Sequence, residues 1–105
     1  FGKADPQTAV LVWGAAGHAL DFDDTHIPTD SHLSATTWPT IIALASDVAD
    51  GTLLLRAFAS GYEVAAKLSG PRLGFSLQFR MFHPTSVIGR MAAASAAGVL
   101  LELNA

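Results

Sequence analysis

The sequence predicts an all-α protein, a helical bundle, and three observations lead to this prediction. Four stretches have helical patterns, and no stretch has the pattern of a convincing strand. Proline and glycine fall where these stretches begin and end. The chain has 105 residues, of which 50% are hydrophobic and 14% charged, against about 25% charged residues in an ordinary soluble domain. It is therefore rich in core material, and its length suits one domain with one core.

The first helix is predicted from about Pro6 to Leu20. Asp5 is suited to cap its N-terminus, and proline is favoured at the first helical position. The body of this helix, AVLVWGAAGHAL, is apolar almost all round, which is typical of a buried helix. The polar segment 21–38 is expected to be irregular, and connections of this length are often functional.

Proline and glycine also delimit the second and third helices. Pro39 is expected to open the helix PTIIALASDVAD, and Gly51 to stop it. Thr52 is then expected to cap an amphipathic helix over 53–68. Its predicted apolar face carries Leu54, Phe58, Gly61, Ala65 and Leu68, and the opposite face carries Arg56, Ser60, Glu63 and Lys67, the last two spaced for an ion pair.

The segment 69–82 is predicted to break the helical pattern, because it contains two glycines and a proline. A last helix is predicted from near Pro84 to about Leu103, again apolar on most sides. A chain of this size has too little material to cover two such helices. We therefore expect a piece of a larger helical body, or a chain that buries one face in a partner.

Composition and charge exclude several classes of function. The net charge is −3, and the six Lys and Arg residues are scattered, whereas a nucleic-acid-binding surface needs a dense basic stripe. The absence of cysteine excludes disulfides, thiolate metal sites and thiol catalysis. No apolar run approaches the roughly 20 residues of a membrane span, and no signal-peptide pattern is found. We expect no nucleic-acid partner, no membrane, and a cytoplasmic location, or the mitochondrial matrix in a eukaryote.

The densest polar group is HALDFDDTH, which begins in the last residues of the predicted first helix and continues beyond it. If this helix continued to Thr25, then His18, Asp21 and Thr25 would share one face. Asp23 and Asp24 would point elsewhere, where they could cap or pair. Three interpretations remain open: the acids end a helix and solvate a loop, hold a divalent metal, or carry acid–base catalysis with a histidine. The glycine and glutamate of an EF-hand loop and the HExxH zinc pattern are absent, which disfavours the metal.

A second polar group, FHPTSV, lies at the predicted start of the last helix. Helix N-termini attract anions because their N–H groups are free and the helix dipole is positive there. Thr85 and Ser86 add hydroxyl donors beside His83. The histidines at 18, 26, 32 and 83 are compatible with one shared cleft.

Several motifs together resemble the MmgE/PrpD family. These are WGAAGHALDFDDTH, a histidine seven residues after Thr25, ASGYEVAAKL and FHPTSVIGRMAAASAAGVLLEL. The family forms are close to NGxxxHxLDFDDTH, HPS, GYEVxxRL and HPTxxxGxxxAAAAAxxLLGL. Order and spacing agree from about residue 8 to 104, which is a minor part of a complete family member.

The resemblance implies that residues 1–105 are one partial segment of the family's helical domain, without its lid domain. It implies a cofactor-independent lyase that acts on small polycarboxylates, most closely a 2-methylcitrate dehydratase of propionate metabolism. Cis-aconitate decarboxylase and iminodisuccinate epimerase are alternatives, as is a catalytically inactive helical remnant that self-associates. The resemblance also implies a homodimer.

By the same resemblance, Asp21, His32 and His83 are the expected catalytic residues. Asp21 and His32 form the expected proton-transfer pair, and His83 helps Thr25 to hold the substrate. Expected substrate-binding residues are Thr25, Thr85 and His26. No cofactor and no metal ligand is expected. A histidine suits proton transfer near neutral pH.

The sequence departs from the family forms at several positions. Trp13 replaces the usual asparagine, and Leu33 replaces the proline of HPS. Phe82 or Met81 replaces a glycine, and Arg90 follows Gly89 where a small or aromatic residue is usual. The family's catalytic lysines lie downstream of the matched segment. We therefore expect this chain alone to have little activity.

Overall fold

The computed structural model describes residues 5–45 and 50–103, and within these ranges the fold is all-α, without strands. The elements are α1 (Pro6–His18), the short 3₁₀ helix η1 (Ile27–Thr29), α2 (Ser34–Leu44), α3 (Gly51–Phe79) and α4 (Pro84–Leu100). This confirms the predicted all-α helical bundle. None of the helices in the described ranges is long and apolar enough to cross a membrane.

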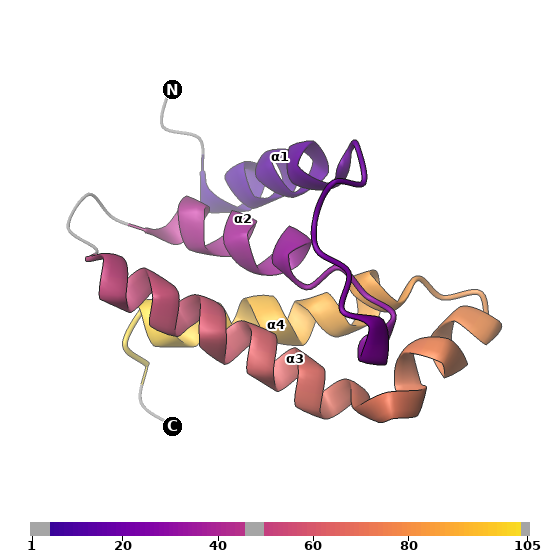
Figure 1. Ribbon diagram of the computed structural model, residues 1–105. Helices are drawn as coiled ribbons and strands as arrows, with labels where there is room; N and C mark the ends of the chain where they lie inside the picture. Colours follow the sequence, from indigo (N-terminus) through magenta and orange to yellow (C-terminus); the bar gives the residue numbers. More distant parts are fainter. Residues whose placement is uncertain (1–4, 46–49, 104–105) are drawn as a thin grey trace.

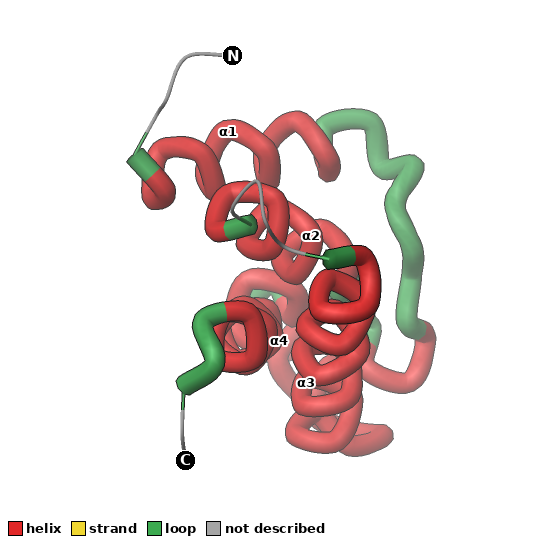
Figure 2. Tube along the Cα trace, turned by 90° about the vertical axis from the view of Figure 1, so that its left-hand side faces the viewer, coloured by secondary structure: helices red, strands yellow, loops and turns green. Residues whose placement is uncertain are grey.

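The helices form a stack of three layers. Figure 1 shows α1 above α2, and α2 above a layer made of α3 and α4. The view along the helices in Figure 2 shows the loop after α1 descending one side of this stack. Two core clusters join the α2 layer to the layer of α3 and α4, one of Leu33, Ala65, Ile88 and Ala92, the other of Ile41, Ala57, Ala96 and Leu100.

Small residues allow the helices to approach closely. A Cβ on Gly61 of α3 would overlap the Ala92 carbonyl oxygen of α4. A Cβ on Gly89 of α4 would overlap the Thr36 side chain of α2. The close contacts fix the start of α4 beneath α2, which determines where His83 lies.

The start of α1 agrees with the prediction. The Asp5 carboxylate accepts hydrogen bonds from the Thr8 hydroxyl at 2.6 Å and the Thr8 N–H at 3.0 Å, and Pro6 is the first helical residue. These bonds lower the pKa of Asp5. The prediction that this helix is buried is wrong for the described chain: α1 has no buried residue, and Leu11 is 72% exposed. The reason is that α1 packs mainly on α2 alone.

The end of α1 differs from the prediction. The helix stops at His18, and Asp21 adopts a left-handed conformation with φ of +56°, which aspartate tolerates better than most residues. The Asp21 N–H donates to the His18 carbonyl oxygen at 3.2 Å. The prediction that the helix reaches Leu20 is therefore wrong, and the condition for a shared face, a helix continuing to Thr25, is not met.

The start of α2 also differs from the prediction. It begins at Ser34, so Pro39 lies inside the helix instead of opening it, and segment 21–38 is not irregular throughout. The Asp24 carboxylate accepts from the Ser34 N–H at 3.0 Å and stabilises the first turn. The hydroxyls of Thr36, Thr37 and Thr40 donate to carbonyls three or four residues earlier. The predicted helical stretch over 46–49 lies outside the described residues.

The start of α3 is set by Asp50, whose carboxylate accepts from the Leu53 N–H at 2.7 Å. Gly51 is the first helical residue and not a stop, and Thr52 is not the cap, so both predictions are wrong. The predicted ion pair is confirmed, with Lys67 Nζ 3.1 Å from Glu63 Oε2.

The second half of α3 is longer than predicted. Gly70, at φ +51° and ψ 177°, kinks the helix, which then continues to Phe79. The predicted break over 69–82 is therefore limited to this kink and to the loop after Phe79. Leu68, predicted on the apolar face, is 55% exposed. The last helix, α4, begins at Pro84 as predicted but ends at Leu100, three residues early.

Candidate functional site

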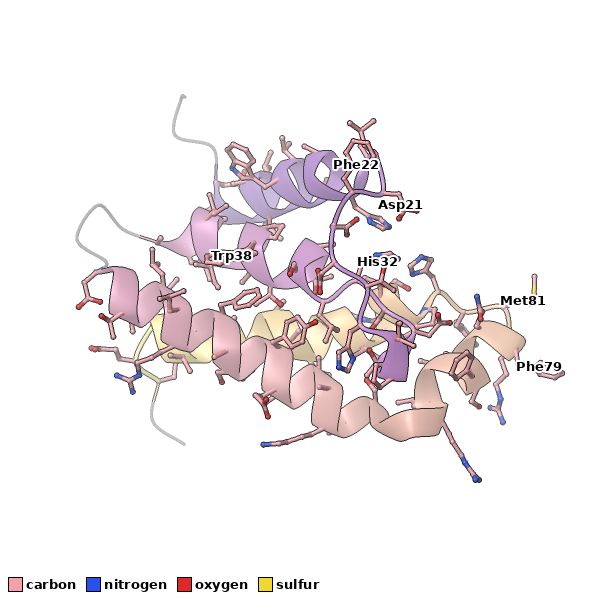
Figure 3. All side chains as sticks on the ribbon, viewed as in Figure 1. Asp21, Phe22, His32, Trp38, Phe79 and Met81 are labelled. Carbon is pink, nitrogen blue, oxygen red and sulfur yellow. The ribbon has the colours of Figure 1, made fainter. Side chains whose placement is uncertain are left out.

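Three histidines meet where α1 ends, α2 begins and α4 begins. His18 is the last residue of α1, His32 lies just before α2, and His83 is the N-cap of α4. The ring centroids of His18 and His32 are 4.8 Å apart, and those of His18 and His83 are 6.2 Å apart. Figure 3 shows Asp21 at the end of α1 with His32 below it in the view. The fold thus gathers side chains that are 65 residues apart in sequence.

Asp23 lies between two of these rings. Its carboxylate oxygens are 2.9 and 3.1 Å from His18 Nδ1, and Oδ2 is 3.7 Å from His32 Nδ1. The Asp23 side chain is only 9% exposed. A carboxylate so little exposed needs donors to offset its lost hydration, and His18 Nδ1 supplies one, whereas His32 Nδ1 donates to the Asp24 carbonyl oxygen.

The orientation of the His32 ring follows from its hydrogen bonds. Nδ1 is 3.0 Å from the Asp24 carbonyl oxygen, which only accepts, so Nδ1 carries a hydrogen. In the neutral ring, Nε2 is then a free acceptor. Asp21 Oδ1 lies 3.9 Å from this nitrogen, close enough to stabilise the ring once Nε2 takes a proton.

Two contacts hold the His32 backbone and the preceding loop. The His32 N–H donates to Thr85 Oγ1 at 2.9 Å, and Thr85 is buried at the start of α4. The Asp24 carboxylate, besides capping α2, accepts from the Tyr62 hydroxyl at 3.0 Å. Burial raises the pKa of Tyr62 to about 12, with a further contribution from the Asp24 carboxylate.

The turn before His32 is closed by its own polar groups. The His26 N–H donates to the Ser31 carbonyl oxygen at 2.9 Å, and His26 Nδ1 lies 2.8 Å from Thr29 Oγ1. The turn rests on Gly74 of α3, where a Cβ would overlap the Thr29 carbonyl oxygen. Because this turn is held in place, the position of His32, which directly follows Ser31, is also fixed.

A groove of about 540 Å³ is lined by two of the three histidines, His18 and His83. Its walls are mostly apolar and come from α1, α2 and α4. Its polar lining includes His18, His83, Thr85, Ser86 and Arg90. His83 also lines a second hollow, of about 370 Å³, together with His32. The groove therefore offers an apolar wall, a guanidinium and imidazoles to one ligand.

The structure brings some of the predicted site residues together and leaves others apart. Asp21, His32 and His83 lie in or beside the cluster. Thr85 lines the groove, although its oxygen already accepts from His32. Thr25 is exposed in the loop, and His26 is engaged with Thr29 and packs edge-on against Tyr62. The roles assigned to these residues stay predictions.

The sequence placed His18 in a possible shared cleft with His32 and His83 but assigned it no role, and the contributions of Asp23 and Tyr62 were not predicted. His18 and Asp23 were visible in HALDFDDTH, but the assumed helix to Thr25 pointed Asp23 away from the site. Asp24 was expected to cap or pair, and it does both. Tyr62 gave a weaker signal, since a single hydroxyl among apolar residues of α3 does not reveal its partner.

The same cluster offers possible cation ligands. One ligand atom from each of His18, Asp21, Asp23 and His32 lies within 4.8 Å of the others. However, Nδ1 of both rings already donates a hydrogen bond, and a metal at either atom would have to replace that hydrogen. The expectation that no residue is a metal ligand stays a prediction.

Fold and site together define a class: an all-α domain with a cluster of histidines and carboxylates beside a groove. The chain belongs to the MmgE/PrpD family, since the model of the MmgE/PrpD N-terminal domain matches residues 2–105. It is 37% identical over 107 residues to a human protein named cis-aconitate decarboxylase, and 36% identical over 117 residues to the mouse protein of that name.

These matches cover 97% and 99% of this chain but only 22% and 23% of the relatives. The chain thus spans less than a quarter of the length of the curated relatives that it matches. No solved structure gave a significant match.

Proposed function

We propose that this chain is the helical segment of a cofactor-independent lyase, and that it holds a small polycarboxylate and moves protons at it. The observation that carries the proposal is the His32 ring, whose Nε2 is left as an acceptor 3.9 Å from Asp21. A positioned imidazole beside a carboxylate is suited to general acid–base chemistry. His32 lines the smaller hollow, which meets the larger groove at His83, so a substrate that spans the two would lie against the His32 ring.

The groove has features that favour a polyanion. Arg90 supplies a guanidinium, which pairs well with carboxylates. The N-terminus of α4, beginning at Pro84, adds the positive end of a helix dipole. The hydroxyl hydrogen of Thr85 is a further donor, since the Thr85 oxygen accepts from the His32 N–H, whereas Ser86 Oγ already donates to the His83 carbonyl oxygen. Together these groups favour a ligand with two or three carboxylates.

Decarboxylation of cis-aconitate is the reaction we favour, because both curated relatives carry that name. The bond between carbon and one carboxylate breaks, CO₂ leaves, and the electron pair stays on the substrate, delocalised toward its double bond. One carbon of the delocalised anion then takes up one proton. The imidazolium of His32 is suited to supply this proton from Nε2, with Asp21 stabilising the charged ring beforehand.

Dehydration of 2-methylcitrate is the second candidate, favoured by the sequence motifs. Here a base removes a carbon-bound proton, the double bond forms, and the leaving hydroxyl takes a proton to become water. His32 Nε2 is the proposed base. The two reactions need the same proton carrier and differ in which bond to carbon breaks.

The test is calorimetric titration of the 105-residue chain with cis-aconitate, 2-methylcitrate and citrate, with proton NMR of the incubated mixtures. We expect saturable binding that His32→Gln and His83→Gln both weaken at least about tenfold, which corresponds to about 1.4 kcal/mol. Loss of CO₂ from cis-aconitate identifies decarboxylation, and formation of an alkene from 2-methylcitrate identifies dehydration. A helical, folded chain that binds none of the three acids would overturn the proposal and favour the inactive helical remnant.

A further inference from the structure

We propose that His18 and Asp23 form a histidine–aspartate dyad that gives the site a second proton-transfer group. In this dyad His18 contacts the substrate, and Asp23 is the positioning residue that fixes the His18 ring. The catalytic part of the proposal rests on the proposed function; the positioning part stands on the geometry alone.

The contact between the two residues is specific. Both Asp23 oxygens lie within 3.1 Å of His18 Nδ1, and the carboxylate is 9% exposed. An ionised carboxylate only accepts, so Nδ1 must carry the hydrogen, whether the ring is neutral or protonated. The reactive nitrogen of His18 is therefore Nε2.

The position of His18 fits a role in the reaction. It lines the groove together with His83 and Arg90, and it retains 35% exposure, so it can exchange protons with solvent. Its ring lies 4.8 Å from the His32 ring. The titratable or charged groups around it are Asp21 and Asp23 of the loop, His32 before α2, and His83 and Arg90 of the α4 side.

Asp23 also serves the second ring. Its Oδ2 lies 2.9 Å from His18 Nδ1 and 3.7 Å from His32 Nδ1. One carboxylate can therefore stabilise a positive charge on either imidazole. The proposed dehydration uses His32 as the neutral base and His18 as the protonated acid.

The proton balance can be written for both candidate reactions. In dehydration, His32 Nε2 takes the carbon-bound proton, the C–H electron pair forms the double bond, and the C–O bond breaks with its pair on oxygen. The Nε2–H of protonated His18 then converts the leaving hydroxide to water. In decarboxylation, CO₂ leaves and its bonding electron pair stays on the substrate. The carbon takes up one proton, for which the Nε2–H of protonated His18 is an alternative donor to that of His32.

The first test needs no substrate. Imidazole ¹⁵N NMR of the chain should show the His18 proton on Nδ1, and Asp23→Ala should move it to Nε2, the usual position in a free ring. Asp23→Glu should restore Nδ1–H at least in part. Asp5→Ala is the matched control, because it removes a capping carboxylate far from the site. A wild-type His18 ring that carries its hydrogen on Nε2 and none on Nδ1 overturns the dyad. This outcome can be read even if Asp23→Ala fails to fold.

The second test is kinetic. His18→Gln and Asp23→Ala should lower kcat at least about 100-fold, change KM by less than about threefold, and remove the alkaline limb of the kcat profile against pH. A purely structural role would lower thermal stability and leave that pH profile unchanged, and this result would overturn the catalytic part. If the folded wild-type chain binds none of the acids, the proposed function fails, and the dyad is judged on the NMR result alone.

Discussion

Tyr62, in the middle of α3, donates a hydrogen bond of 3.0 Å to the carboxylate of Asp24, 38 residues earlier in the chain. The same carboxylate caps α2 at Ser34, and the Asp24 carbonyl oxygen holds His32 Nδ1. One aspartate thus connects α3, α2 and the ring at the centre of the site. Several tests follow from this link and from the packing around it.

Replacing Tyr62 with phenylalanine removes the hydroxyl but keeps the ring. We expect a loss of about 1–3 kcal/mol in the free energy of unfolding, because a half-buried carboxylate loses one donor. Urea denaturation measures the change. Glu63→Gln, at an exposed neighbouring position, should change stability by less than about 0.5 kcal/mol. Equal stability of Tyr62→Phe and wild type would mean that the bond contributes nothing to the fold.

Tyr62 also predicts how stability depends on alkaline pH. Its pKa rises from an ordinary 10.0 to about 12 in the folded chain. Between these values the unfolded chain releases the phenol proton while the folded chain keeps it, so the free energy of unfolding falls as the pH rises. Because Tyr62 is the only tyrosine, an ultraviolet absorbance titration reports its ionisation alone. In Tyr62→Phe this contribution to the alkaline loss of stability should disappear; a wild-type midpoint near 10 would contradict the expectation.

Two glycines should respond to alanine in opposite directions. Gly74→Ala places a Cβ against the Thr29 carbonyl oxygen, so we expect a loss of about 1–3 kcal/mol and a displaced His32 turn. Gly98→Ala in α4 meets no other group within 4 Å and should stabilise the chain by about 0.5–1 kcal/mol. Thermal unfolding of both variants gives the comparison. If Gly74→Ala were as stable as wild type, η1 would not lie as closely on α3 as described.

Arg90 predicts a charge effect on ligand binding. Arg90→Gln should weaken binding of cis-aconitate about three- to tenfold, because the groove loses an exposed guanidinium. Arg56→Gln changes the net charge equally but lies on α3, outside this groove, so it should leave the affinity nearly unchanged. Calorimetry at two salt concentrations separates the effect of the Arg90 guanidinium in the groove from the effect of the net charge of the chain. Equal losses in both variants would show that only net charge matters.

The exposed apolar residues of α1 predict self-association. Val12 is 58% exposed and Leu11 72% exposed, and contiguous exposed apolar surface favours a protein partner. We expect light scattering to give a mass above the 10.9 kDa of one chain. Val12→Lys should lower this mass, whereas Leu55→Lys, at an exposed site of α3, should not. A monomeric wild type at high concentration would exclude the expected homo-oligomer.

The sequence predicted the parts of the fold that local signals determine. Asp5 with Pro6 and the helix start at Pro84 were both recognised, because a cap or a helical proline acts on its own first turn. The ion pair of Glu63 and Lys67 follows from helical spacing alone in the same way.

The errors arose where distant residues decide the structure. The cap of α2 comes from Asp24, ten residues earlier, so Ser34 gave no local sign of a helix start and Pro39 was taken as the opening. The motif resemblance pointed to Asp21, His32 and His83, which lie close together in the structure, and their roles stay predictions. The pairing of Asp23 with His18 was not predicted, because it depends on the left-handed Asp21 that turns the chain back.

The weak anchoring of α1 has a consequence for how the site is assembled over time. This helix buries none of its residues and packs mainly on α2, yet its last residue, His18, forms part of the groove. Helices with so few buried contacts are the first to open in local fluctuations. His18 would leave with α1, while His32 and His83 stay on the inner layers. The groove is therefore complete only while α1 is docked, and the fraction of molecules with α1 docked scales the apparent affinity of the site for a ligand.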